Sequence, residues 1–331
     1  MTTPTVTAND VRAHLISRGL LAADVDVEVS ALTGGVSNDV LAVRGDGIDL
    51  VVKRALSQLR TAQSWYADTA RLQTEGRALQ LVSSILPEAV PAVVDLSSDY
   101  LVIRRAPHEW DTWKTSLLAG HVDPDVGATL GAVLGTVQAA TTAPTSARPD
   151  LSIFADRQAF TQLRVDPFHR QIIVHHPDLG EAIEETITVM AASQDCLVHG
   201  DYTPKNVMHG ASPDHVWVID WEVAHLGDAT FDPAWVTGHL LLKSLRRPSD
   251  QDALRDTAAA FLAAREQVSG APELDHAQFM RQLGCLLVAR VDGRSPVDYL
   301  DDASRVVARQ LGQRALCEPL IPYDELWKDL S

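Results

Sequence analysis

The stretch LVHGDYTPKNV at residues 197–207 carries the densest group of chemically useful side chains in this sequence. It opens with a short apolar run, which is typical of a buried strand, and then places a carboxylate, Asp201, and an amide, Asn206, on one tight loop. A second stretch, VWVIDWE at residues 216–222, is built in the same way, because its apolar run ends in Asp220. The two stretches therefore predict two buried strands, each followed by an acidic residue.

Two carboxylates and an amide form the set of side chains that phosphoryl transfer requires. One carboxylate orients the attacking hydroxyl group, while the amide and the second carboxylate hold Mg²⁺. The pattern therefore predicts an ATP-dependent kinase, provided that the rest of the chain supplies a site for the nucleotide.

The overall composition is that of an ordinary globular protein with an acidic surface. The 331 residues are 46% hydrophobic and 22% charged, and the formal net charge is −16. This charge argues against a general nucleic-acid binder, which needs clustered lysine and arginine. Residues 1–104 hold 12 acids and 9 bases, a net of −3, whereas residues 105–331 hold 32 acids and 19 bases, a net of −13. The acidity either serves solubility alone or favours a cationic substrate in the second region.

The three cysteines, Cys196, Cys285 and Cys317, are scattered through or beside apolar runs and form no C-x-x-C pair. We expect neither zinc binding nor disulfides, and interpret all three as buried thiols in a reducing cytoplasm. Residues 1–10 lack the apolar core of a signal peptide, and no apolar run approaches the length of a membrane span. The chain is therefore expected to be cytoplasmic.

The first hundred residues alternate in the manner of a small sheet interrupted by one long helix. Apolar alternation and turn residues predict strands over 25–32, 40–43, 48–53, 92–96 and 100–104. Helix-forming residues predict a helix over 57–86 with Leu72, Leu79 and Leu86 on its buried face. The turn that contains Gly34 and Gly35 fits either an ordinary hairpin or a loop whose backbone approaches a phosphate.

Lys53 and Glu75 are candidates for a nucleotide-binding pair. Lys53 ends the third predicted strand, and Glu75 lies on the helix that follows. A kinase needs a lysine at this place to hold the α- and β-phosphates, and a glutamate on the next helix to position it. Each residue alone is more typical of a solvated charge. Only the two together indicate a nucleotide site.

The second region begins near residue 105 and is mainly helical. We expect helices over 126–140, 154–163, 179–191, 232–245, 250–268, 275–290 and 296–316. The pair Ser295-Pro296 is a typical helix start, with a capping serine before a proline in the first turn. The sequence thus predicts two domains, 1–104 for the nucleotide and 105–331 for catalysis and substrate binding.

Together these motifs resemble the aminoglycoside phosphotransferase and choline kinase family, small-molecule kinases with a protein-kinase-like fold. The similarity runs from about residue 25 to 310 and follows the family's motifs in order: Gly34-Gly35, Lys53, Glu75, His199-Gly200-Asp201, Asn206, Asp220-Trp221-Glu222, Gly227-Asp228 and Phe231-Asp232-Pro233. The resemblance implies an α+β, bilobal fold: a small five-stranded antiparallel N-terminal lobe with one long helix, and a larger, mainly helical C-terminal lobe.

The resemblance also implies roles at the centre of the site. Asp201 would accept or orient the proton of the substrate hydroxyl, and Asn206 and Asp220 would coordinate Mg²⁺. His199 could act as a base, but the resemblance favours a buttress for the loop, because kinase chemistry depends more on positioning than on proton removal. Asp232 would bond the backbone of the same loop.

The nucleotide site would be built from residues 1–104 and from the hinge that connects them to the second region. Lys53 would bind the α- and β-phosphates of ATP and would itself be held by Glu75. Ser37, Gly34, Gly35 and nearby backbone would cover the phosphates. The hinge at 102–106 would contact the adenine through its main chain, at Ile103, Arg104 and Ala106.

The phosphate acceptor is expected to be a small hydroxylated metabolite. Candidates are an amino sugar or aminoglycoside, another sugar such as methylthioribose, or an amino alcohol. The acidic second region, with Glu222 and Asp228 near the site, favours an acceptor that carries an amine. Two other hypotheses are a nucleotide-binding pseudokinase, which has no need of Asp201, and a protein kinase. The absence of an Ala-Pro-Glu motif after Asp220 argues against the latter.

Overall fold

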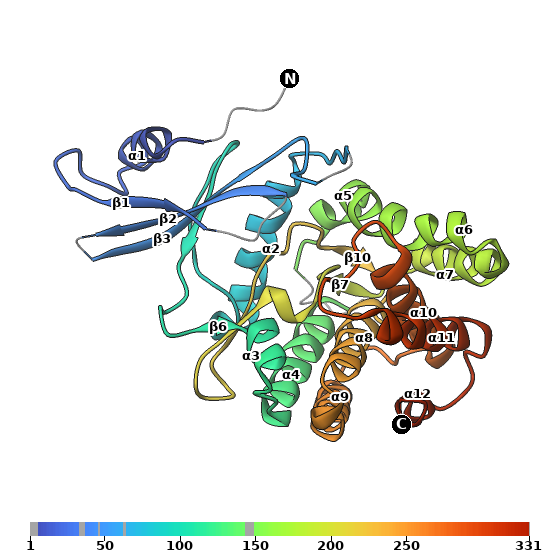
Figure 1. The fold of residues 1–331 in the computed structure, drawn as a ribbon. Coiled ribbons are helices and arrows are strands. Elements are labelled where there is room, and N and C mark those ends of the chain that lie inside the picture. The colour runs from blue at the N-terminus through green and yellow to red at the C-terminus, as the bar shows by residue number, and fades with distance from the viewer. Residues whose placement is uncertain (1–5, 33–36, 46, 62–63, 143–148, 331) are drawn as a thin grey trace.

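The computed structural model describes residues 6–32, 37–45, 47–61, 64–142 and 149–330. Figure 1 shows an antiparallel sheet and helix α1 (Ala8–Ser17) at one end of the molecule and a mass of helices at the other, with α2 between them. This is the predicted α+β architecture, and the five-stranded sheet is confirmed. Among the described residues, no helix has the length and apolarity needed to cross a membrane.

The N-terminal sheet has strand order β1-β2-β3-β5-β4, and all neighbouring strands are antiparallel. Its strands are β1 (Glu28–Ala31), β2 (Asn38–Gly45), β3 (Ile48–Ala55), β4 (Val93–Leu96) and β5 (Leu101–Arg104). In β3, Lys53 lies opposite Val40 on one side and Leu101 on the other. Lys53 is therefore on a central strand and is 6% exposed.

Helix α2 (Arg71–Ile85) contacts β3, β4 and β5 of this sheet and is shorter than the predicted helix over 57–86. The segment before it folds back on itself through a bridge between Gln58 and Tyr66, and Asp68 accepts a hydrogen bond from the N–H of Ala70 at 2.9 Å. These local contacts compete with helix formation and delay its start. The predicted apolar face is nevertheless present, since Leu72 and Leu79 are buried in the core.

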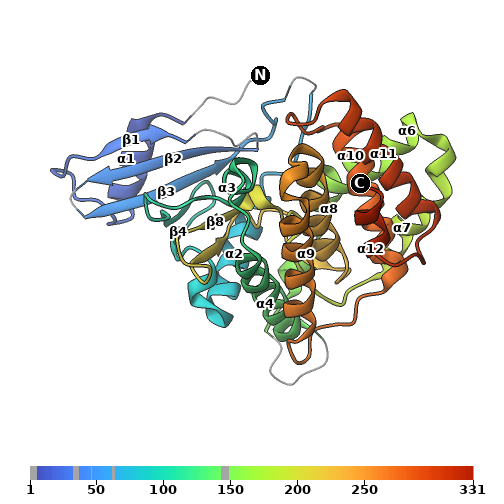
Figure 2. The same ribbon diagram turned by 60° about the horizontal axis from the view of Figure 1, so that its bottom comes forward.

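The helical part is built around a close pair of helices, α4 and α9, which lie side by side in both views (Figures 1 and 2). Three glycines of α4 face α9, and a Cβ on Gly131 would lie only 2.0 Å from the carbonyl oxygen of Phe261. Glycine at this position lets the two helix backbones approach each other. The helices of this part are α3 (Trp113–Ala119), α4 (Pro124–Thr141), α5 (Gln158–Phe160), α6 (Gln171–His175), α7 (Gly180–Ala192), α8 (Phe231–Arg246), α9 (Gln251–Glu266), α10 (His276–Asp292), α11 (Asp302–Cys317) and α12 (Asp324–Lys328).

Short strands in the helical part carry the two motif stretches. They are β6 (Asp111–Thr112), β7 (Cys196–Val198), β8 (Val207–His209), β9 (Val216–Val218) and β10 (His225–Gly227). Strand β7 pairs with β10, while β6, β8 and β9 form a separate three-stranded sheet. The segment 199–206, here called the HGD loop, therefore joins the two small sheets. Single 3₁₀ turns occur at Pro87–Ala89, Ser152–Ala155, Pro177–Leu179, Pro204–Asn206 and Pro248–Asp250.

Three sequence predictions in this part are wrong. The helix expected over 154–163 is instead a 3₁₀ turn, the short α5 and a π-helix, Thr161–Arg170, which contains a proline that cannot donate a backbone hydrogen bond. The last long helix starts at Asp302, not at 296, because Asp301 caps it by accepting the N–H of Ser304 at 2.8 Å. Cys317, expected to be buried, is exposed.

Candidate active site

The HGD loop is held by a carboxylate from α8. Asp232 accepts hydrogen bonds from the backbone N–H groups of His199 at 2.7 Å and Gly200 at 2.9 Å. Gly200 has a φ of 79°, and a Cβ there would lie 2.9 Å from the carbonyl oxygen of Val223, so glycine is required. Burial raises the pKa of Asp232 to about 7, although the two N–H groups favour its ionised form. Asp232 thus fixes the loop backbone.

His199 is locked as a neutral side chain. Its Nδ1 accepts a hydrogen bond from the N–H of Asp201 at 3.0 Å, so the proton is on Nε2, which donates to the carbonyl oxygen of Ile219 at 3.0 Å. Burial lowers its pKa to about 4. Because both ring nitrogens are engaged, the imidazole has no free atom with which to take a proton from a substrate.

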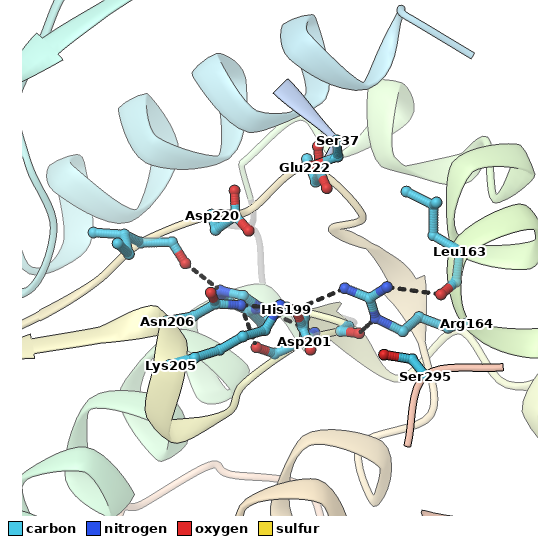
Figure 3. Close-up of polar contacts among 12 residues, drawn as sticks. Ser37, Leu163, Arg164, His199, Asp201, Lys205, Asn206, Asp220, Glu222 and Ser295 are labelled. Atoms are coloured by element: carbon cyan, nitrogen blue, oxygen red, sulfur yellow. Dashed lines mark hydrogen bonds and ion pairs between the residues drawn. The ribbon is translucent and has the colours of Figure 1, made fainter. Parts of the chain in front are cut away.

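Asp201 lies at the centre of a polar cluster in the HGD loop (Figure 3). Its Oδ2 accepts from Arg164 Nη2 at 2.7 Å, Lys205 Nζ at 2.9 Å and Asn206 Nδ2 at 2.8 Å. Burial raises the pKa of Asp201, but Arg164 and Lys205 outweigh burial and hold it below its usual value. Asp201 is therefore an ionised carboxylate with a fixed direction.

Arg164 is a site residue that sequence reasoning missed. It lies in the π-helix, is 8% exposed, and also donates from Nε to Gly200 O at 2.9 Å and from Nη1 to Leu163 O at 2.7 Å. The guanidinium thus joins the side chain of Asp201 to the backbone beside it. No local signal marks this arginine, because its partners in the HGD loop are 36 or more residues away and the segment has an ordinary mixed composition.

Lys53 links the sheet to α2 and to the loop after β9. Its Nζ lies 2.5 Å from Glu75 Oε1 and 3.0 Å from Asp220 Oδ1. Burial lowers the pKa of Lys53, but the two carboxylates overcome this and raise it; the same contact helps to hold the pKa of Asp220 low against its own burial. Asp220 has a φ of 69° and is the one non-glycine residue in the described segments with a positive φ. Such strain is typical of functional positions.

Asn206 and Asp220 offer the kind of oxygen atoms that Mg²⁺ prefers. The N–H of Ile219 donates to the carbonyl oxygen of Asn206 at 2.9 Å, so the two stretches are bonded side by side. The Nδ2 of Asn206 donates to both the backbone and the side chain of Asp201, which leaves its amide oxygen as the atom available to a metal. The donor set therefore fits the expected metal.

The residues expected to contact the nucleotide lie on the N-terminal sheet and in the segment that follows β5. Ser37 is buried at the start of β2, and its carbonyl oxygen accepts from the N–H of Leu56 at 3.0 Å. Gly34 and Gly35 lie outside the described residues. Ile103 is buried on β5, Arg104 is exposed at its end, and Ala106 is half-buried just beyond it. Ile103 and Arg104 belong to the strand that pairs with β3, which carries Lys53, and Ala106 follows that strand.

Glu222 and Asp228, expected near the substrate, already have partners. Glu222 is 4% exposed and accepts from Arg71 Nε at 3.1 Å and Asn38 Nδ2 at 3.0 Å, which ties the loop after β9 to α2 and β2. Asp228 is 3% exposed and accepts from Gln278 Nε2 at 2.8 Å. Both carboxylates connect elements of the fold, and neither is free to bind an amine.

Comparison with known proteins places this geometry in context. The model of the phosphotransferase enzyme family (APH) matches residues 28–271. A methylthioribose kinase of Bacillus cereus is 26% identical over 230 residues, which cover 61% of this chain and 57% of the relative. The similarity thus spans little more than half the length of that relative.

Two solved structures share the fold. An amicoumacin kinase in complex with AMP-PNP, Ca²⁺ and Ami is 14% identical with a TM-score of 0.57, over 98% of this chain and 100% of that one. A choline kinase from Streptococcus pneumoniae is 15% identical with a TM-score of 0.52, over 94% of this chain and 99% of that one. At these identities the likeness concerns the fold alone.

Proposed function

This chain belongs to the phosphotransferase enzyme family, and on that premise we propose that it transfers the γ-phosphoryl group of ATP to a hydroxyl group of a small metabolite. One observation carries the proposal. Lys53, Glu75 and Asp220 form a bonded set beside Asp201 and Asn206, although the five residues come from two segments of the matched region that lie far apart in the sequence. A protein that only binds nucleotide has no need of a buried, ionised Asp201.

The residues then divide the reaction between them. Asp201 receives the proton of the acceptor hydroxyl while the acceptor oxygen bonds to the γ-phosphorus. The bond from that phosphorus to the β–γ bridging oxygen breaks, and ADP leaves. Lys53 holds the α- and β-phosphates, and Glu75 keeps its ammonium in place. Mg²⁺, bound by Asn206 and Asp220, would neutralise the charge on the phosphates.

The nucleotide is expected to lie between the two parts of the chain. We propose residues 1–104 as the nucleotide-binding lobe, in which Ser37 and its neighbours cover the phosphates and the main chain at Ile103, Arg104 and Ala106 contacts the base. Residues 105–331 would form the catalytic and acceptor-binding lobe. In this arrangement His199 and Asp232 hold the HGD loop and do not touch the substrate.

The acceptor is proposed to be sugar-like. The curated relatives are named methylthioribose kinases, which supports a hydroxyl of a sugar or a similar polyol. The preference for an amino sugar, an aminoglycoside or an amino alcohol depended on free carboxylates at Glu222 and Asp228. Since both are bonded within the fold, that argument for an amine no longer holds.

A coupled ADP-release screen tests the proposal. The purified chain with Mg-ATP is offered sugars, amino sugars, aminoglycosides, amino alcohols and sugar acids, and products are identified by mass spectrometry. We expect ADP release that depends on an acceptor and matches the phosphorylated product in amount. Binding of Mg-ATP without any product would indicate a pseudokinase, and phosphate transfer to serine or threonine peptides would indicate a protein kinase.

A further inference from the structure

A group of basic side chains on the C-terminal helices makes no ion pair with a carboxylate of the described residues. We call it the basic cluster: Lys114 of α3, His239 and Lys243 of α8, and Arg290 of α10. Lys243 is 1% exposed, and the nearest acceptor recorded for its Nζ is the carbonyl oxygen of His239 at 3.5 Å, which is too long for a strong hydrogen bond. Within the described segments, no carboxylate lies within ion-pair distance of Lys114 or Lys243.

The two lysines of the cluster lie near one aromatic ring. The Nζ atoms of Lys243 and Lys114 lie 5.7 Å and 5.9 Å from the centre of the Tyr299 ring. Burial lowers the pKa of Lys243 to about 7, and the charges of Lys114 and Arg290 act in the same direction. A buried lysine whose charged neighbours are cations is costly to the fold, because no carboxylate of the described residues offsets the loss of its hydration.

The basic cluster borders Asp201. The guanidinium groups of Arg290 and Arg164 lie 5.8 Å and 5.9 Å from the centre of the same Phe168 ring, and Arg164 is bonded to Asp201. Burial lowers the pKa of Arg290, whereas the charges of Asp201 and Asp298 act upwards. Arg290 Nη1 also donates to Ser295, at 2.6 Å to its carbonyl oxygen, and Figure 3 draws Ser295 beside Arg164. Burial lowers the pKa of His239, and the charge of Lys205, which is bonded to Asp201, acts in the same direction.

Polar atoms without a partner surround the same place. The buried atoms Trp235 Nε1, Arg290 Nε and Tyr299 Oη have no hydrogen-bond partner among the described residues. All three can donate. Trp235 lies one turn before His239 on α8, and its ring centre is 5.9 Å from the guanidinium of Arg164. Among the described residues, no carboxylate is bonded to these three atoms, so an anionic acceptor of hydrogen bonds would complement them.

We propose that the basic cluster binds an anionic group, a carboxylate or a phosphate, on the phosphate acceptor, whose hydroxyl then lies at Asp201. The proposal rests on the proposed function and narrows its substrate class to small hydroxylated anions. It reverses the preference for an amine that the acidic composition of residues 105–331 favours, because the charges next to Asp201 are basic even though the region as a whole is acidic.

The phosphates of ATP are a different ligand from the one proposed here. The nucleotide would be held by Lys53 on β3, whereas the basic cluster is built from α3, α8 and α10 of the C-terminal part. Lys114 and Tyr299 are half-buried, so they form the more exposed side of the cluster. We therefore expect the two ligands to bind together.

A substitution of Lys243 separates ligand binding from folding. Lys243→Met removes the charge and leaves an unbranched side chain one atom shorter, and Lys328→Met, at an exposed lysine on α12, is the control for the same chemical change. Without ligand, Lys243→Met should raise the melting temperature, because an unpaired buried cation is replaced by an apolar group. A purely structural lysine would instead lower it on substitution, and that result would overturn the proposal.

Anion binding is measured by the melting temperature with sulfate and with glucuronate, at constant ionic strength and with saturating Mg-AMP-PNP. The wild type and Lys328→Met should be stabilised by both probes, and Lys243→Met should lose about ten- to a hundredfold in affinity, the range of a charge-assisted hydrogen bond. Equal stabilisation of all three proteins would overturn the proposal.

An acceptor series then tests the substrate class directly. Glucose, glucosamine, glucuronate and glucose 6-phosphate differ mainly in charge, and ADP release and product are measured for each. We expect the two anions to be turned over best, with a raised acceptor KM but an unchanged KM for ATP in Lys243→Met. Preference for glucose or glucosamine would overturn the proposal. If no acceptor is phosphorylated, the proposed function fails for this series, and the melting experiment still decides whether the cluster binds anions.

Discussion

Arg164 offers the sharpest single perturbation of the site. Its guanidinium bonds Asp201 Oδ2 at 2.7 Å, Gly200 O at 2.9 Å and Leu163 O at 2.7 Å. Arg164→Gln removes the charge, whereas Arg164→Lys keeps the charge but cannot make all three bonds, since the planar fork is lost. The two variants therefore separate the electrostatic effect on Asp201 from the support of the loop backbone.

The expected magnitude follows from these contacts. A hydrogen bond to a charged group is worth about 1.5–3 kcal/mol, and about 1.4 kcal/mol corresponds to one pKa unit, so Arg164→Gln should raise the pKa of Asp201 by about one to two units. Arg164 lowers the pKa of Asp201 in the folded protein, so removing Arg164 should raise that pKa. Because Asp201 must be ionised to accept a proton, the acid limb of kcat/KM should move to higher pH in the glutamine variant.

The assay is the pH profile of kcat/KM for the acceptor found in the screen, measured beside the melting temperature of each variant. We expect both variants to lose stability, because the carbonyl groups of Leu163 and Gly200 lose donors. Only Arg164→Gln should show the large shift of the acid limb. A glutamine variant with the wild-type profile and the wild-type kcat would refute the assignment of Arg164 as the residue that positions Asp201.

Two further predictions concern the nucleotide site and the helix packing. Glu75→Gln leaves Lys53 with one carboxylate in place of two, and should lower kcat/KM for ATP by about ten- to a hundredfold in steady-state kinetics, whereas an unchanged value would remove Glu75 from the site. Gly131→Ala would place its Cβ against Phe261 O and should lower the free energy of unfolding by about 1–3 kcal/mol in urea titrations. Gly180→Ala, where the Cβ meets only an ordinary contact, is the control, and equal losses in both would contradict the close packing of α4 on α9.

The sequence predicted what is local or repeated, and it failed where partners come from distant segments. The apolar alternation of the first hundred residues was sufficient for the five strands. The motif spacing predicted that Asp201, Asn206 and Asp220 share one site; the fold brings the three residues together, and their roles stay predictions. The start of α11 at Asp302 was missed because Ser295 fits a capping pattern but is bonded to Arg290 instead. The sequence holds two possible helix caps, Ser295 and Asp301, and the contact of Ser295 with Arg290 determines which of them starts the helix.

The charge around the site was the least predictable feature. Glu222 and Asp228 appear in the sequence as free acids. Only the fold shows that Glu222 accepts a hydrogen bond from Arg71 and that Asp228 accepts one from Gln278. Lys243 appears in the sequence as an ordinary helical lysine, but the fold buries its side chain, which is 1% exposed. Net charge sums over a whole region, whereas a ligand responds to the few groups around it, so composition alone is a poor guide to the charge at the site.

The most direct test of phosphoryl transfer is the turnover of Asp201→Asn. The wild type, Asp201→Asn and the control Asp214→Asn, an exposed aspartate in the turn between β8 and β9, are compared with Mg-ATP and the acceptor by product mass spectrometry. We expect Asp201→Asn to lower kcat by about 10²- to 10⁴-fold with ATP binding retained, and Asp214→Asn to match the wild type. Turnover by Asp201→Asn at the wild-type rate would contradict the mechanism.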